Sequence, residues 1–130
     1  MSNQYKPAHM TDKMEDCLGR LLSLTESVNQ LFGQYQGSLG GYNTPWTPRP
    51  PIGTVNINTA KLAAWNIEDL DEGCPWVYQR QGMWAITDLH RTLERMVEEH
   101  PDGEEIPFED IQQIQIDIRV FADEFIRNLV

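Results

Sequence analysis

Two long segments, one toward each end of the chain, repeat their apolar residues with the period of an α-helix. Between residues 14 and 35 a seven-residue repeat forms one seam from two sets of side chains: Met14, Leu21, Val28 and Tyr35, and Cys17, Leu24 and Leu31. Between residues 107 and 130 the steps are of three and four, through Phe108, Ile111, Ile114, Ile118, Phe121, Phe125 and Leu129. These periods predict two long helices that each bury one face along their length.

The first helix has a predicted start and end as well as a seam. Thr11 and Asp12 can cap its N-terminus, and Gly33 and Gly37 are residues at which it can stop. Three further apolar residues widen the seam: Leu18, Leu22 and Phe32. A wide stripe favours a helix that packs on several neighbours of its own chain, as in a bundle. The alternative is self-association through the coiled-coil-like seam, although the segment holds only three heptads.

The last segment carries a second, conflicting pattern. From Ile114 to Val120 apolar and polar residues alternate, as they do in a half-buried strand. The helical period extends over a much longer stretch than this alternation, so a helix is the preferred prediction. In such a helix Ile116 and Val120 form an apolar patch off the main face. That patch predicts burial among several elements or a contact with another chain.

Residues 36–53 follow the first helix and hold four glycines and four prolines. Neither a helix nor a central strand can run through this composition, so residues 36–55 are predicted to form an extended linker. Within it, Tyr42, Trp46 and Arg49 are of the types in which interface energy concentrates, and we expect them to bind a partner. The alternative is that this arm lies back over its own domain, with Trp46 filling a groove.

Two shorter helices are predicted between the linker and the last helix. One covers residues 56–70 and is capped by Asn58 or Thr59. Its apolar content is Leu62, Ala63, Trp65, Ile67 and Leu70. The other helix covers residues 83–99, where His90 lies on one stripe with the apolar residues Met83, Ile86, Leu93 and Val97. We expect His90 at the edge of the core rather than in a metal or catalytic site.

The acidic run of residues 68–73 is expected to form a solvated turn that ends the helix of residues 56–70. A calcium loop was considered for this run. An EF-hand loop that began at Asp69 would have Gly73 at its fifth position and Arg80 at its twelfth, where oxygen ligands are needed. The run therefore does not match the motif.

Together these patterns predict a mainly α protein, a small bundle of about four helices with a Pro/Gly-rich extended linker between the first and second. Residues 1–35 form an N-terminal arm and the long coiled-coil-like helix. Residues 36–55 form the linker, and residues 56–130 form an acidic helical region. A chain of 130 residues builds one modest core, so one domain is expected overall.

Charge is concentrated in the second half of the chain. Residues 66–130 hold sixteen acidic and five basic side chains, whereas residues 1–65 hold four acidic and five basic ones. Such a field repels nucleic acid and attracts basic partners, so direct binding to DNA or RNA is not expected. Eight acidic residues between positions 94 and 110 are predicted to contact a partner: Glu94, Glu98, Glu99, Asp102, Glu104, Glu105, Glu109 and Asp110.

The two cysteines, Cys17 and Cys74, lie 57 positions apart and belong to no CxxC pair or larger cluster. Isolated cysteines are typical of a reducing compartment, and both are expected to be free thiols buried as small apolar groups. The N-terminus lacks the apolar core of a signal peptide, and no apolar run is long enough for a membrane span. A cytoplasmic location is expected, either alone or in a larger particle assembled there.

No reaction class can be built from the motifs of the chain. It has no Gly-rich phosphate loop, no Ser or Cys placed beside a His, and no paired-His metal motif. We expect a non-enzymatic interaction protein without catalytic, metal or cofactor residues, an assembly or adaptor component whose helices and Trp-bearing linker dock on partner subunits. The alternative is an acidic inhibitor, immunity protein or antitoxin that blocks a nucleic-acid-binding enzyme by charge mimicry. The expected partners are proteins, including a basic nucleic-acid-binding protein or a second copy of the chain, and not a membrane.

Overall fold

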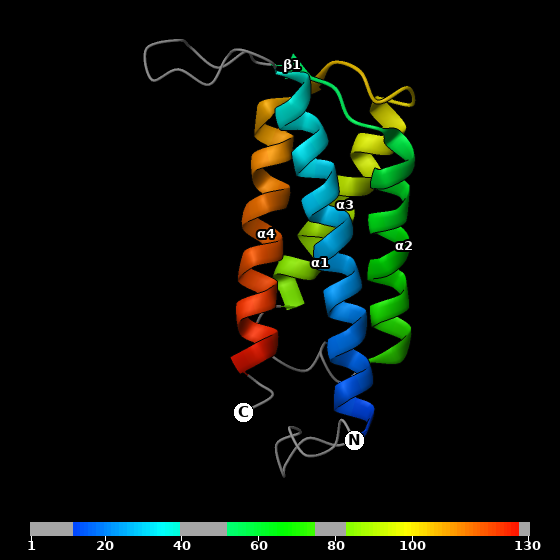
Figure 1. Cartoon of the computed structure of the whole chain (residues 1–130), viewed down its shortest axis with the longest axis vertical. Helices are drawn as coiled ribbons and strands as arrows, with labels where there is room; N and C mark the ends of the chain where they lie inside the picture. Colours follow the sequence, from blue (N-terminus) through cyan, green and yellow to red (C-terminus); the bar gives the residue numbers. More distant parts are fainter. Residues whose placement is uncertain (1–11, 40–51, 75–82, 128–130) are drawn as a thin grey trace.

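The computed structural model describes residues 12–39, 52–74 and 83–127, and these residues are mainly helical. Figure 1 shows the four helices, which are α1 (Asp12–Ser38), α2 (Ile57–Gly73), α3 (Met83–Glu99) and α4 (Phe108–Arg127). Two short strands, β1 (Ile52–Gly53) and β2 (Ile106–Pro107), complete the order of elements. The prediction of a mainly α bundle with four helices is confirmed. Tyr42, Trp46 and Arg49 lie outside the described residues.

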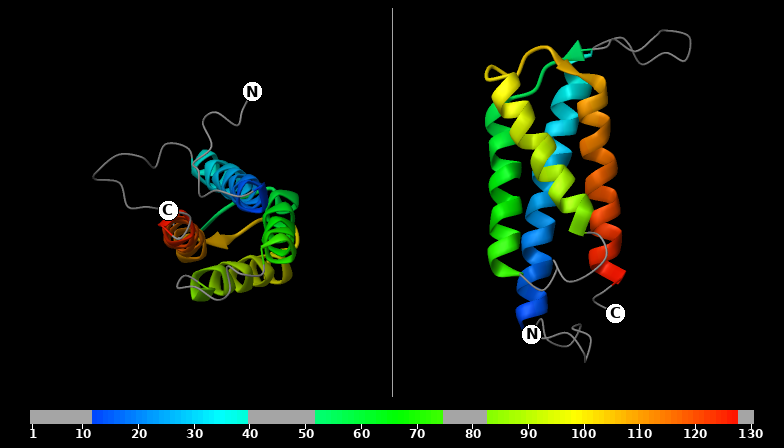
Figure 2. Two further views of the ribbon diagram at one scale, coloured as in Figure 1. Left: turned by 90° about the horizontal axis from the view of Figure 1, so that it is seen from below. Right: turned by 180° about the vertical axis from the view of Figure 1, so that it is seen from behind.

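The helices stand at the four corners of the bundle, as the end view in Figure 2 shows. α1 packs on α2 and α4, and α3 occupies the opposite corner, where it also packs on α2 and α4. The helix α3 is tilted across its neighbours in the second view of Figure 2. Among the described helices, none combines the length and apolar character needed to cross a membrane.

The seam of α1 faces the interior of the bundle. Six of its residues are at most 2% exposed: Cys17, Leu21, Leu24, Val28, Leu31 and Tyr35. The interpretation of α1 as a core helix of its own chain is therefore confirmed. Leu18 and Phe32 widen this face as expected, but Leu22 is 61% exposed and the prediction that it joins the seam is wrong. Leu22 follows the fully packed Leu21 by one helical step, which turns it toward solvent.

The end of α1 was also predicted wrongly, because the helix continues through Gly33 and Gly37 to Ser38. Tyr35 explains the continuation, since its ring is 1% exposed and its hydroxyl donates a hydrogen bond to the carbonyl oxygen of Ile106 at 3.3 Å. This packing outweighs the cost of about 1 kcal/mol that each glycine adds inside a helix.

The N-cap of α2 lies two residues before Asn58 and three before Thr59, the two predicted caps, and the helix ends later than its predicted stop. Asn56 is the N-cap, and its side-chain oxygen accepts a hydrogen bond from the backbone N–H of Asn58 at 2.9 Å. The acidic run remains helical as far as Gly73, so the predicted solvated turn is wrong. Leu70, within the run, is 2% exposed, and the burial of its side chain favours continuation of the helix.

The segment from Ile114 to Val120 is part of α4, which resolves the conflict between helix and strand in favour of the helix. Ile114 and Ile118 are buried, while Ile116 is 47% exposed and Val120 packs partly against the core. The helical period prevailed because it places the whole series from Ile111 to Phe125 on one buried face.

A two-stranded antiparallel ladder closes one end of the bundle and joins the entry of α2 to the entry of α4. Ile52 pairs with Pro107 and Gly53 with Ile106. Beside it, the N–H of Val55 donates a hydrogen bond to the carbonyl oxygen of Gly103 at 2.8 Å. Gly103 has φ +75°, and a side chain there would overlap the carbonyl oxygen of Val55, so this position requires glycine. Strands of two residues leave no pattern that the sequence analysis could use.

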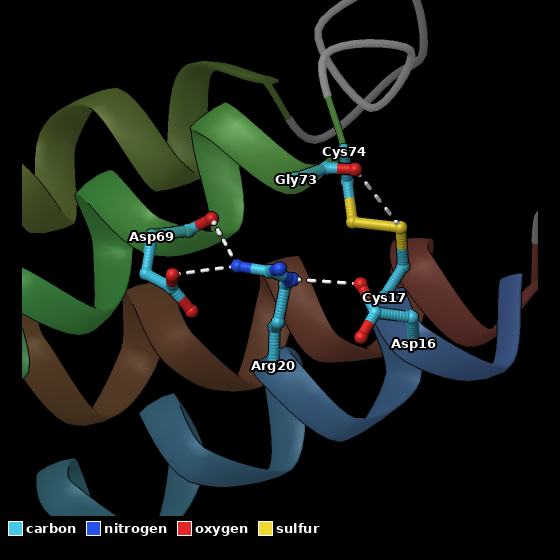
Figure 3. Close-up of polar contacts among 6 residues, drawn as sticks. All are labelled: Asp16, Cys17, Arg20, Asp69, Gly73 and Cys74. Atoms are coloured by element: carbon cyan, nitrogen blue, oxygen red, sulfur yellow. Dashed lines mark hydrogen bonds and ion pairs between the residues drawn. A yellow bond between two sulfur atoms is a disulfide. The ribbon is translucent and has the colours of Figure 1, made fainter. Parts of the chain in front are cut away.

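Cys17 and Cys74 form a disulfide, which corrects the prediction of two free thiols. Their predicted burial is right, because both residues are 0% exposed. The beginning of α1 lies against the end of α2, and the two Cα atoms are 5.9 Å apart (Figure 3). This distance is ordinary for a disulfide, whereas the 57 positions between the cysteines hid their proximity in the sequence.

Candidate functional site

The outer face of α2 exposes two large apolar side chains that the sequence analysis assigned to the buried content of this helix. Leu62 is 47% exposed and Trp65 is 58% exposed. The residues that α2 buries are Ala60, Ala63, Asn66, Ile67 and Leu70. These residues occupy one helical stripe, and Leu62 and Trp65 lie beside it on the solvent side. An exposed tryptophan on a well-packed helix is informative, since large aromatic side chains are mostly buried.

A groove of about 290 Å³ runs beside Trp65 between α2 and α3, which we call the Trp65 groove. Its lining residues are Lys61, Ala64, Trp65 and Glu68 from α2, and Glu94, Val97 and Glu98 from α3. Ala64 and Val97 are partly buried against the core, while the charged residues are exposed. The groove therefore combines an apolar base and an aromatic wall with a charged rim.

The rim of the Trp65 groove is acidic. Three carboxylates face one Lys61 ammonium, which gives the groove a local formal charge of −2 when His90 is neutral. His90 lies at the side of the groove, and its Nε2 atom is 2.8 Å from Glu94 Oε1 and 3.7 Å from Glu68 Oε1. His90 thus lies between one acid of α3 and one acid of α2. Its side chain is 31% exposed, which agrees with its expected place at the edge of the core.

The structure distributes the eight predicted acidic contact residues over three places. Glu94 and Glu98 line the Trp65 groove. Glu99 ends α3, and Asp102, Glu104 and Glu105 follow in the connection to α4, all of them exposed. Glu109 and Asp110 belong to the first turn of α4. Glu109 is exposed, whereas the Asp110 side chain is 15% exposed and forms an ion pair with Arg95, at 2.5 Å.

Five members of the groove were not predicted as contact residues from the sequence: Lys61, Ala64, Trp65 and Glu68 of α2, and Val97 of α3. Glu68 was placed in an acidic turn, and Trp65 was counted as core. The spacing of three between Trp65 and Glu68 would put them on one face of a continuous helix, and this is the signal that could have found the pair. Their approach to Glu94 and Glu98 depends on the packing of α2 against α3, which no local pattern contains.

A second acidic cluster lies at the other side of α2, next to the disulfide, and its acids are engaged in holding α1. Arg20 of α1 reaches Asp69 of α2 through Nη1, at 2.5 Å from Oδ1 and 3.1 Å from the carbonyl oxygen (Figure 3). Arg20 Nε donates to Asp16 Oδ2 at 2.9 Å. The hydrogen bonds to Asp16 and then to Asp69 raise the pKa of the Arg20 guanidinium, which stays charged. We interpret this cluster as structural.

The groups of the Trp65 groove can attract a cation. Carboxylates and the face of an indole ring both attract cations. Within the three described ranges, no His, Cys, Asp and Glu side chains gather in a group of three or more that could hold a metal ion.

Comparison of the chain with protein-family models, with curated proteins and with solved structures gives no match.

Proposed function

We propose that this protein is a non-enzymatic interaction protein, an assembly or adaptor component that docks a partner on the outer face of α2. The exposure of Trp65 beside Leu62 is the observation that carries the proposal. Tryptophan is enriched among the residues that dominate interface energies, and water-exposed apolar surface gains free energy when a partner covers it. The groove next to Trp65 supplies a recess for a partner side chain.

The rigidity of α2 supports this role. The helix is tied to α1 by the disulfide at its end, by Asp69 bound to Arg20, and by Asn66, whose Nδ2 donates to Ser27 Oγ at 3.1 Å. A surface held in place before binding loses less conformational entropy when the partner arrives. The contacts on the inner face of α2 therefore hold the helix in place, and with it the outer face on which the partner docks.

Two further contacts belong to the proposal. Tyr42, Trp46 and Arg49 are proposed as a second contact region in the linker, as expected from their residue types. A homo-oligomer is proposed only through outer surfaces, because the α1 seam with Leu24 and Leu31 is already buried within its own bundle. The exposed Ile116 of α4 is one such outer residue.

The proposal is tested by recovery of the tagged protein from its native cells, with partners identified by mass. We expect the wild-type chain to retain a stoichiometric partner and the double variant Leu62→Ser/Trp65→Ser to lose it. The control is Leu22→Ser. Leu22 is the same residue type as Leu62 and is 61% exposed, but it lies on α1 rather than on α2. Retention of the same partner by the double variant would remove the outer face of α2 from the function.

The exposure of the acids favours one second candidate, an inhibitor, immunity protein or antitoxin that mimics a phosphate track. Seven of the eight acidic residues between positions 94 and 110 are exposed, all except Asp110. A charge mimic loses affinity steeply as salt rises, whereas an aromatic-anchored contact does not. Under this candidate, replacement of Glu98, Glu99, Glu104 and Glu105 by Gln abolishes binding, and an unchanged affinity would eliminate it.

A cytoplasmic location remains part of the proposal, and the disulfide makes it testable. Disulfides persist in oxidising environments and are rare in the cytosol. Alkylation of the thiols in intact cells, before lysis, counts how many cysteines are free. Two alkylated thiols support the cytoplasmic location, whereas a protected Cys17–Cys74 pair contradicts it.

A further inference from the structure

We propose that the Trp65 groove binds an arginine side chain from a basic segment of the partner protein. This inference rests on the proposed function and names the chemistry that the partner presents. The volume of about 290 Å³ lies at the lower end of ligand pockets, so the groove suits one long side chain rather than a whole small-molecule ligand.

Charge complementarity identifies the occupant as a cation. Glu68 approaches the groove from α2, while Glu94 and Glu98 approach it from α3, so carboxylates line both walls. Lys61 is the single cation among the lining residues and leaves the carboxylates in excess. A cation that enters gains attraction from both helices, and the partly buried Ala64 and Val97 receive the aliphatic part of its side chain.

Trp65 favours arginine over lysine as that cation. The planar guanidinium stacks on an indole face and donates hydrogen bonds in a fork that matches a carboxylate, whereas an ammonium is a compact and strongly hydrated point charge. Trp65 is 58% exposed, which leaves its indole accessible to such a contact. The carboxylates of the two walls lie close together, since Glu68 and Glu94 approach the same His90 nitrogen at 3.7 and 2.8 Å, and both line the groove with Trp65.

The arrangement in the groove differs from that of the other acids of the chain. Asp16 and Asp69 are bound to the guanidinium of Arg20, and Asp110 is bound to that of Arg95, whereas in the groove Glu94 and Glu68 approach the imidazole of His90 at 2.8 and 3.7 Å. Glu99, Glu104 and Glu105 are exposed and do not belong to the lining of the Trp65 groove. The combination of an aromatic wall, an apolar base and an excess of carboxylates belongs to the Trp65 groove.

The test measures binding of fluorescently labelled hexa-arginine and hexa-lysine peptides by anisotropy, at low and at physiological salt. We expect wild-type protein to prefer hexa-arginine by several-fold. The triple variant Glu68→Gln/Glu94→Gln/Glu98→Gln is expected to lose at least about tenfold in affinity for hexa-arginine. The matched control is Glu99→Gln/Glu104→Gln/Glu105→Gln, which removes the same charge outside the groove and is expected to lose less than about threefold.

Two single variants test the aromatic wall and the cation of the rim. Trp65→Ala is expected to lose about fivefold for hexa-arginine and less for hexa-lysine, because the stacking contact is removed. Lys61→Gln is expected to bind both peptides about twofold to threefold more tightly, because it removes a repulsive charge. Circular dichroism and thermal unfolding verify the fold of each variant. If the triple variant unfolds, the single variants Glu98→Gln and Glu99→Gln are compared instead. Each removes one charge, the first inside the groove and the second outside it, and the affinity for hexa-arginine is measured for both.

Equal losses from the two triple variants would overturn the proposal, since they would show attraction by the general field alone. Equal affinity of the wild type for the two peptides, or wild-type binding by Trp65→Ala, would also overturn it. These outcomes are separable from a failure of the proposed function. A partner that is lost with Leu62→Ser/Trp65→Ser, while both triple variants bind alike, leaves the docking face standing and removes the arginine recognition.

Discussion

The interface between α1 and α2 and the interface between α3 and α4 are held together by different physics. Five contacts between described residues tie α1 to α2 beyond apolar packing: Cys17–Cys74, Arg20–Asp69, Ser23–Asn66, Ser27–Asn66 and Gln34–Thr59. Between α3 and α4 the structure shows the ion pair of Arg95 with Asp110 and a large apolar contact. In α4 the fully buried carboxylate of Asp117 receives a hydrogen bond from Gln113, but its Oδ2 atom has no partner among the described residues.

The comparison shows that one bundle can combine a well-specified interface, between α1 and α2, with a buried group that lowers stability, the carboxylate of Asp117. Polar groups between α1 and α2 are satisfied, so they specify how these helices align. The buried Asp117 costs free energy, because an ionised carboxylate without full compensation is destabilised away from water. The two walls of the Trp65 groove come from these two interfaces. One wall is on α2, which is cross-linked to α1, and the other is on α3, which is held mainly by apolar packing. Five predictions break or sharpen the comparison.

Removal of the disulfide is expected to have the largest effect. Cys17→Ala/Cys74→Ala should lower the free energy of unfolding by about 3–4 kcal/mol, because the crosslink restricts a long loop of the unfolded chain. Urea denaturation of the oxidised wild type and of the variant measures the difference. Reduced wild type serves as the control and should resemble the variant. Equal midpoints for oxidised and reduced wild type would show that the crosslink does not stabilise this interface.

Replacement of the buried acid should act in the opposite direction. Asp117→Asn keeps the acceptor for Gln113 and removes the buried charge, so we expect a gain of about 1–3 kcal/mol at neutral pH. Urea denaturation at neutral pH measures it. A loss of stability would contradict the assignment of Asp117 as a costly buried charge.

The same variant should also change the dependence of stability on pH. The pKa of Asp117 in the folded state lies above its usual value of 3.8, mainly because the carboxyl group is buried. The hydrogen bond from Gln113 lowers this pKa, and the negative charge of Asp88 raises it. The folded state then binds more protons than the unfolded state, so this group lowers stability as pH rises from its usual pKa through the raised one. The Asn variant should lack this decline, whereas parallel profiles for the two proteins would contradict the assignment.

Loss of a satisfied polar contact between α1 and α2 should have a smaller effect. Asn66→Ala removes hydrogen bonds to Ser27 Oγ and to the carbonyl oxygen of Ser23, and we expect a cost of about 1 kcal/mol. Ser27 keeps a partner, since its hydroxyl donates to the carbonyl oxygen of Leu24 at 2.8 Å. Chemical denaturation measures the cost. A cost as large as that of disulfide removal would show that Asn66 and not the crosslink dominates the interface.

The ion pair between α3 and α4 should have the smallest effect. Arg95→Gln is expected to cost about 0.5 kcal/mol or less, because the Arg95 side chain is 49% exposed and solvent screens the pair. Thermal unfolding at low and at high salt measures this difference, which should shrink as salt rises. A large loss that persists at high salt would mean that α3 and α4 depend on this pair more than on their apolar contact.

Periodicity determined much of the fold and little of the site. The seam of α1 and the face of α4 were correct because they extend over many turns, where local pattern and burial coincide. The ends of α1 and α2 were wrong because Tyr35 and Leu70 gain burial from other elements, which outweighs the local signals for termination. Of the seven groove residues, only Glu94 and Glu98 were predicted as contact residues.

The amino-acid sequence by itself determined that four amphipathic helices form and that the anionic charge gathers in the second half, because spacing and composition are local properties. Tertiary structure alone decided that Cys17 meets Cys74, that Trp65 stays outside the core, and that the acids of α2 and α3 face one groove. Each of these depends on which helices become neighbours. That choice minimises exposed apolar surface over the whole chain rather than within any one segment.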